Sequence, residues 1–131
     1  MPHIIIEHSA NLADLTDMDA LVTAVHLAAL DDGLPAVAGL RTRAAPRDNY
    51  RIADGDPAYG FVCVTARIGP GREPDAVQRF LTRIIDTVDD VLAPLRPDYP
   101  VAISAEVQLI DPTMRINRNH VRAHLAQSGR A

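Results

Sequence analysis

The segment His3-Ile4-Ile5-Ile6-Glu7-His8 near the start of the chain predicts a β-strand, and it decides the fold. Its three consecutive isoleucines are not interrupted by a polar residue. Strands with one face in water alternate apolar and polar residues, so an unbroken apolar run indicates a strand that is covered on both faces. We therefore expect residues 3–8 to form a central strand of a sheet.

The residues that follow predict a helix and then a second strand. Apolar side chains recur at helical spacing from Leu15 to Ala29, and Thr16 with Asp19 resembles a weak capping box. Gly33 is expected to end this helix. Residues 37–44 then resume an extended pattern. This order of elements is one β-α-β unit.

After a polar loop at residues 46–57, the same order of elements repeats. Residues 59–68 form a second, nearly continuous apolar strand. Residues 74–92 predict a helix with proline in its first turn, and their apolar positions form the most regular amphipathic stripe in the chain. Residues 101–110 show the partial alternation of a strand. A short helix is expected at residues 121–127.

Each β-α-β unit joins its two strands through one helix, as parallel neighbouring strands require. The predicted fold class is therefore α/β, an α+β sandwich in which two β-α-β units form a four-stranded mixed sheet with two helices on one face. The first strand of each unit looks apolar on both faces, although two helices cover only one. We therefore expect a homo-oligomer in which another copy covers the open face. The length of 131 residues predicts a single domain over residues 1–131.

The composition predicts a soluble, cytoplasmic protein that binds neither nucleic acid nor membrane. Hydrophobic residues make up 47% of the chain, and no apolar run approaches the roughly 18 residues of a membrane span. The N-terminus lacks the basic region and the cleavage pattern of a signal peptide. The net charge of -4 opposes general attraction to anionic partners. All 13 basic residues are arginine, so position rather than residue type must indicate an anion site.

Pro2 is the most distinctive candidate for chemistry. Removal of Met1 leaves its secondary amine as the N-terminus, directly ahead of the first strand. A free α-amino group has a pKa of about 7.7–8.0, which burial or a nearby cation lowers, so this amine can act as a general base near neutral pH. The alternative is that Pro2 only begins the strand, where its missing N–H costs nothing. For Pro2 taken alone, that structural interpretation is preferred.

Three arginines are candidates for binding carboxylates. Arg72 follows Gly69-Pro70-Gly71 and precedes the second predicted helix, so its guanidinium and the free N–H groups of the helix can hold one carboxylate together. Arg41 and Arg43 are two residues apart in a strand and project from one face, where they can hold a second carboxylate. Solvated surface arginines are the alternative at each position.

The remaining polar residues predict neither a metal site nor a cofactor. His120 and His124 have metal-ligand spacing on a helix, but they lack an intervening glutamate and a third ligand. Residues 54–57 resemble a tight turn more than a calcium loop. Cys63 lies in an apolar strand pattern, where an inert buried thiol is expected, and His3 is isolated in the sequence.

Several segments together are more specific than any one of them. They are Met1-Pro2-His3-Ile4-Ile5-Ile6-Glu7, Leu40-Arg41-Thr42-Arg43-Ala44, Tyr50-Arg51-Ile52-Ala53-Asp54-Gly55-Asp56, Arg67-Ile68-Gly69-Pro70-Gly71-Arg72, and Asp111-Pro112-Thr113 with Asn117, Asn119 and Val121. In combination they resemble the 5-carboxymethyl-2-hydroxymuconate Delta-isomerase family of the tautomerase superfamily. The resemblance covers nearly the whole chain. It implies β-α-β units with an N-terminal catalytic proline, in a homotrimer whose sheets face a central barrel.

The resemblance also implies a cofactor-free isomerisation of a small polycarboxylate dienol, in the catabolism of hydroxyphenylacetate-type aromatic compounds. Pro2 takes the proton from the 2-hydroxyl of the dienol and returns it at C5, which gives the conjugated 2-oxo-3-ene acid. Arg41 and Arg72 match the carboxylate-binding arginines of the family, and Arg43 is a further candidate beside Arg41. Two other interpretations stay open: a promiscuous tautomerase that acts on a different dienol acid, and a non-catalytic oligomeric module that binds small acids.

Overall fold

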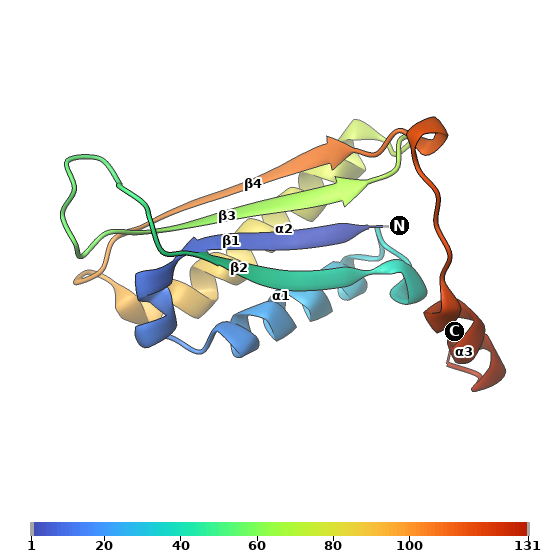
Figure 1. Cartoon of the computed structure of the whole chain (residues 1–131), viewed down its shortest axis with the longest axis horizontal. Coiled ribbons are helices and arrows are strands. Elements are labelled where there is room, and N and C mark those ends of the chain that lie inside the picture. The colour runs from blue at the N-terminus through green and yellow to red at the C-terminus, as the bar shows by residue number, and fades with distance from the viewer. Residues whose placement is uncertain (1, 131) are drawn as a thin grey trace.

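A four-stranded mixed sheet forms one layer of the molecule (Figure 1). A computed structural model of the chain describes residues 2–130. The strands pair in the order β2-β1-β3-β4, where β1 is His3–Ser9, β2 is Arg41–Arg47, β3 is Gly60–Ile68 and β4 is Val101–Leu109. β1 with β2 and β3 with β4 are parallel, whereas β1 with β3 is antiparallel. The predicted mixed sheet built from two β-α-β units is therefore confirmed.

The helices α1 (Met18–Asp32) and α2 (Pro74–Leu92) form the second layer and cover one face of the sheet (Figure 1). Alternate residues of each strand point toward this layer. The core between the layers contains buried side chains from both helices and from β1 and β3, among them Leu21, Val25, Phe80, Ile84, Val88, Ile4, Ile6, Val62, Val64 and Ala66. The apolar stripe predicted for α2 is thus the face that it buries. Among residues 2–130, no helix covers the opposite face of the sheet, which we call the open face (Figure 1).

Two local expectations are wrong. Residues 37–44 do not form one extended segment, because Val37–Gly39 is a short 3₁₀ turn and β2 begins only at Arg41. The strand then continues through Pro46, since β2 is an edge strand, where a residue without an N–H is tolerated. The loop expected from residue 46 accordingly begins later.

The start of α1 also differs from the expected capping box. Its N-cap is Asp17, whose carboxylate accepts a hydrogen bond from the backbone N–H of Ala20 at 3.1 Å. The pairing expected between Thr16 and Asp19 is therefore wrong by one residue. Gly33 ends the helix as predicted, in the left-handed conformation with φ of 86°.

The C-terminal segment passes across the end of the sheet where the N-terminus lies (Figure 1). Beyond β4, the backbone N–H of Ile110 donates to the carbonyl of Ile68 at 2.7 Å. The segment then reaches α3 (His120–Gln127), and Asn119 just before it donates to the carbonyl of Ala38 at 2.7 Å. Among residues 2–130, we find no helix with the length and apolar character of a membrane span.

Candidate active site

Pro2 is buried at the end of the sheet where β1 and β2 begin. Its carbonyl accepts a hydrogen bond from the backbone N–H of Arg41 at 3.2 Å. Met1, whose removal exposes the Pro2 nitrogen, lies outside the described residues. This position is compatible both with a residue that begins the strand and with a base at the end of the sheet, so the surroundings of Pro2 must distinguish the two.

Three arginines surround His3 on the open face of the sheet. Strand pairing places His3 between Arg41 of β2 and Arg67 of β3. The Nη1 atom of Arg43 lies 3.2 Å from Nδ1 of His3. We refer to Arg41, Arg43 and Arg67 as the arginine cluster. It adjoins Pro2 through His3, the following residue, and through Arg41, whose backbone N–H donates to the Pro2 carbonyl.

The surroundings of His3 oppose a positive charge on its ring. Burial lowers the pKa of His3 below its usual 6.5, and the charges of Arg43, Arg41 and Arg67 lower it further. The ring is therefore neutral near pH 7. Since a guanidinium can only donate, Nδ1 of His3 accepts from Arg43, and the proton of the neutral ring is on Nε2. The cluster and the ring together present only hydrogen-bond donors to the open face.

Arg72 lies in the loop between β3 and α2. Its Nη1 donates to the carbonyl of Gly69 at 3.1 Å, and its Nη2 contacts the carbonyl of Leu34 at 3.5 Å. Leu34 follows α1, so this guanidinium is directed toward the helical layer. The structure thus places Arg41 and Arg43 beside His3, while the backbone carbonyls of Gly69 and Leu34 hold Arg72 in its loop.

Sequence reasoning did not connect Arg67 and His3 with the site. Arg67 lies near the end of the nearly continuous apolar strand at residues 59–68, and that pattern does not reveal which residue of another strand stands opposite. The antiparallel register of β1 and β3 supplies this information by pairing Arg67 with His3. The only signal in the sequence is that both residues are polar positions at the ends of apolar strands.

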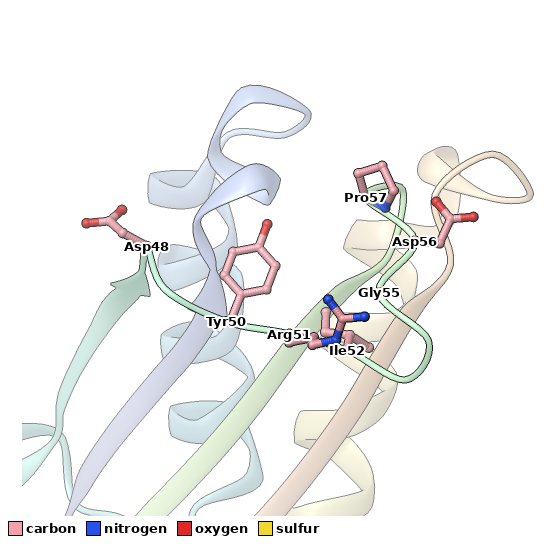
Figure 2. A pocket seen from close by; sticks show the side chains of 7 residues that line it. All are labelled: Asp48, Tyr50, Arg51, Ile52, Gly55, Asp56 and Pro57. Carbon is pink, nitrogen blue, oxygen red and sulfur yellow. The ribbon is translucent and has the colours of Figure 1, made fainter.

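Two cavities lie at the end of the sheet opposite Pro2. One cavity of about 280 Å³ is formed by the loop after β2, and its lining residues are Asp48, Tyr50, Arg51, Ile52, Gly55, Asp56 and Pro57 (Figure 2). The Arg51 guanidinium packs over Gly55 and donates to the carbonyl of Asp54 at 3.1 Å. Within one chain, this hollow is therefore separated from Pro2 by the length of the strands, and its arginine is already engaged by its own loop.

Other candidate residues of the sequence are dispersed. Cys63 is half-buried on the open face, opposite Glu7 and Ser104, so it is not a thiol of the core as expected. His124 lies 3.3 Å from the Arg130 guanidinium on the exposed terminal helix. No group of three His, Cys, Asp or Glu side chains within residues 2–130 is arranged to hold a metal ion.

Structures with the same arrangement of sheet and helices belong to the tautomerase superfamily, and the fold places this chain in that class. A crystal structure of 5-carboxymethyl-2-hydroxymuconate delta-isomerase is 28% identical, with a TM-score of 0.83 over 95% of this chain and 93% of the other. A fused 4-OT symmetric trimer is 15% identical, with a TM-score of 0.62 over 88% of this chain and 93% of the other, and shares the fold.

The family follows from matches along almost the entire sequence. The 5-carboxymethyl-2-hydroxymuconate isomerase family model matches residues 2–125. The 5-carboxymethyl-2-hydroxymuconate Delta-isomerase of Escherichia coli is 30% identical over 123 residues, which are 94% of this chain and 98% of that protein. The chain belongs to the 5-carboxymethyl-2-hydroxymuconate isomerase family.

Proposed function

We propose that this protein is an isomerase that converts 5-carboxymethyl-2-hydroxymuconate to its 2-oxo-3-ene isomer, with Pro2 as the general base and acid. One observation carries the proposal: in a member of this isomerase family, the buried Pro2 stands next to an arginine cluster. The proposed substrate suits these surroundings, because it is a small dienol that carries several carboxylates. Guanidinium groups bind carboxylates through paired, charge-assisted hydrogen bonds.

The proposed reaction needs one proton-transferring group and no cofactor. Once Met1 is removed, the Pro2 amine takes the proton of the 2-hydroxyl, and the O–H electrons complete the C2=O double bond. The C2=C3 electrons move to C3=C4, and the C4=C5 electrons take the same proton back from Pro2 at C5. The double bonds shift and no atom is gained or lost.

The surroundings of Pro2 favour this role. Burial and nearby cations disfavour the charged form of an amine, and the same two causes lower the pKa of the adjacent His3. A neutral amine is the form that accepts a proton. Arg41 and Arg43 bind a carboxylate and stabilise the negative charge of the dienolate, and Arg72 binds a second carboxylate.

A homotrimer with inward-facing sheets is part of the proposal. The open face carries half-buried apolar side chains, including Ile5 and Phe61, that no helix within the described residues covers. Phe61 packs edge-on against Tyr50, with ring centroids 6.1 Å apart. A symmetric trimer among the proteins of the same fold supports this assembly.

Ketonisation of the dienol, followed by its ultraviolet absorbance, tests the proposed function. The protein must be shown by mass spectrometry to begin at Pro2. Replacing Pro2 with alanine or acetylating the terminus is expected to reduce kcat/KM about 10²–10⁴-fold, the usual contribution of a general base. Near-normal turnover by either form refutes the proline base. A dienol acid without the carboxymethyl group is expected to react more slowly, and equal rates point to a less specific tautomerase.

A further inference from the structure

The arginine cluster contains one cation that the proposed function does not use. Arg67 is exposed at the end of β3, with His3 on one side and Gln108 of β4 on the other. The ion pairs among residues 2–130 are Arg47 with Glu7, Arg79 with Asp32, Arg83 with Asp31 and Arg96 with Asp89. No arginine of the cluster is among them, so the cluster has no acidic partner in the described chain.

Arg47 shows that the same face can neutralise an arginine. It lies on β2 with Arg41 and Arg43, and its Nη2 atom is 2.8 Å from Oε2 of Glu7. On the opposite side of the cluster, Glu106 of β4 lies diagonal to Arg67 and forms no ion pair with it. Arg41 on β2 and Arg67 on β3 flank His3 from either side of β1, and Arg43 lies on β2 with Arg41, so three like charges around one residue repel one another. A bound polyanion removes this repulsion.

We infer that Arg67 binds a carboxylate of the substrate together with Arg41 and Arg43, and that the cluster makes the site selective for a tricarboxylate over a dicarboxylate. The inference deepens the proposed function and rests on it for the identity of the substrate. Because the cluster adjoins Pro2, an acid bound there lies next to the proposed base. The sheet itself, rather than a loop, then determines how many carboxylates the site accepts.

His3 is a positioning residue in this arrangement. Its Nδ1 atom accepts the hydrogen bond of Arg43 and so fixes one guanidinium beside the other two. A protonated ring would lose this acceptor and repel the cluster. His3 therefore acts through Arg43 and the bound acid rather than on the reacting atoms.

Calorimetric binding of unreactive acids tests the role of Arg67. The probes are propane-1,2,3-tricarboxylate and glutarate, the proteins are wild type and Arg67→Gln, and the control is Arg47→Gln on the same face. Arg67→Gln is expected to lower the affinity for the tricarboxylate about tenfold or more, because one charge-assisted contact is lost. Its affinity for glutarate is expected to fall less than about threefold. The affinity of Arg47→Gln for each acid is expected to stay within about twofold of the wild-type affinity. Equal tricarboxylate affinity in wild type and Arg67→Gln, or no tricarboxylate binding by wild type, overturns the inference.

A second pair of variants tests the positioning role of His3. Asparagine offers an acceptor oxygen near the place of Nδ1, whereas alanine offers none. His3→Asn is expected to retain tricarboxylate affinity within about threefold, and His3→Ala to lose about tenfold. Equal affinities of the two variants overturn this role. Binding of the unreactive acids does not require the Pro2 amine. If the protein binds the tricarboxylate normally but does not ketonise the dienol, the proposed reaction is refuted and the inferred anion site is not.

Discussion

Ile5 and Ile6 are neighbouring residues whose side chains lie on opposite faces of the sheet, so replacing each with alanine compares the two faces directly. Ile6 is fully buried against the helices, with 0% of its surface exposed. Ile5 is half-buried on the open face. Ile6→Ala removes contacts within every chain. Ile5→Ala removes apolar surface that, in the proposed trimer, a second copy buries.

The expected cost of Ile6→Ala follows from the volume that it removes. Isoleucine exceeds alanine by the equivalent of three methylene groups, and burying a methylene contributes about 0.8 kcal/mol. The transfer part is therefore about 2.4 kcal/mol, and the remaining cavity brings the total to about 3 kcal/mol, inside the observed range of about 2–5 kcal/mol. Ile5→Ala costs less within one chain, because part of that side chain already meets water. Its remaining effect depends on association.

Urea unfolding followed by circular dichroism, at two protein concentrations, measures both effects relative to wild type. Ile6→Ala is expected to lower the midpoint by about 1–2 M at each concentration. Ile5→Ala is expected to lower the midpoint more at the lower concentration and to reduce the sedimentation coefficient. A wild-type sedimentation coefficient for Ile5→Ala refutes the covered open face. A loss below about 1 kcal/mol for Ile6→Ala refutes the assigned core.

Two further predictions concern charged groups. The Arg79 guanidinium donates through two nitrogens to Asp32, whose side chain is only 1% exposed, whereas Arg83 pairs with Asp31, whose side chain is 71% exposed. Arg79→Ala leaves a buried carboxylate without its partner, so it is expected to lower the urea midpoint more than Arg83→Ala does. Equal decreases in the midpoint contradict this expectation. For His3, nuclear magnetic resonance titration is expected to give a pKa below 6.5 that rises with added salt. The unfolded chain binds the proton of His3 more readily than the folded chain, so His3 is expected to lower the free energy of unfolding as the pH falls below 6.5. Well above pH 6.5 it is expected to have no effect. A measured pKa above 6.5 would reverse the sign of this pH dependence.

Local patterns predicted most of the fold because they report which side chains must be buried. The stripe of α2 is an example, since Phe80, Ile84 and Val88 form one buried face. The boundaries of β2 were not predictable in the same way. The apolar residues at 37–39 form a 3₁₀ turn, and the strand beyond Ala44 exists because His8 pairs with Pro46. The extension of the strand depends on pairing with β1, and the turn contacts Asn119, which is distant in sequence and donates to the carbonyl of Ala38.

The candidate site shows the same limit more clearly. Arg41 and Arg43 were recognisable because two-residue spacing in a strand places side chains on one face. Arg67 was not, because its nearness to His3 comes from the antiparallel register of two strands that are far apart in sequence. The contacts of Arg72 were likewise hidden, since its hydrogen bonds with the carbonyls of Gly69 and Leu34 depend on how the β3–α2 loop folds.

The pH dependence of kcat/KM for dienol ketonisation by protein that begins at Pro2 tests the central claim most directly. A neutral Pro2 amine as the base predicts a rate that rises with pH through a single ionisation below the value of about 7.7–8.0 for a free α-amino group. Acetylation of the terminus is expected to abolish this rise together with most of the activity. An acetylated protein that keeps both the rate and its pH profile contradicts the assignment of Pro2 as the base.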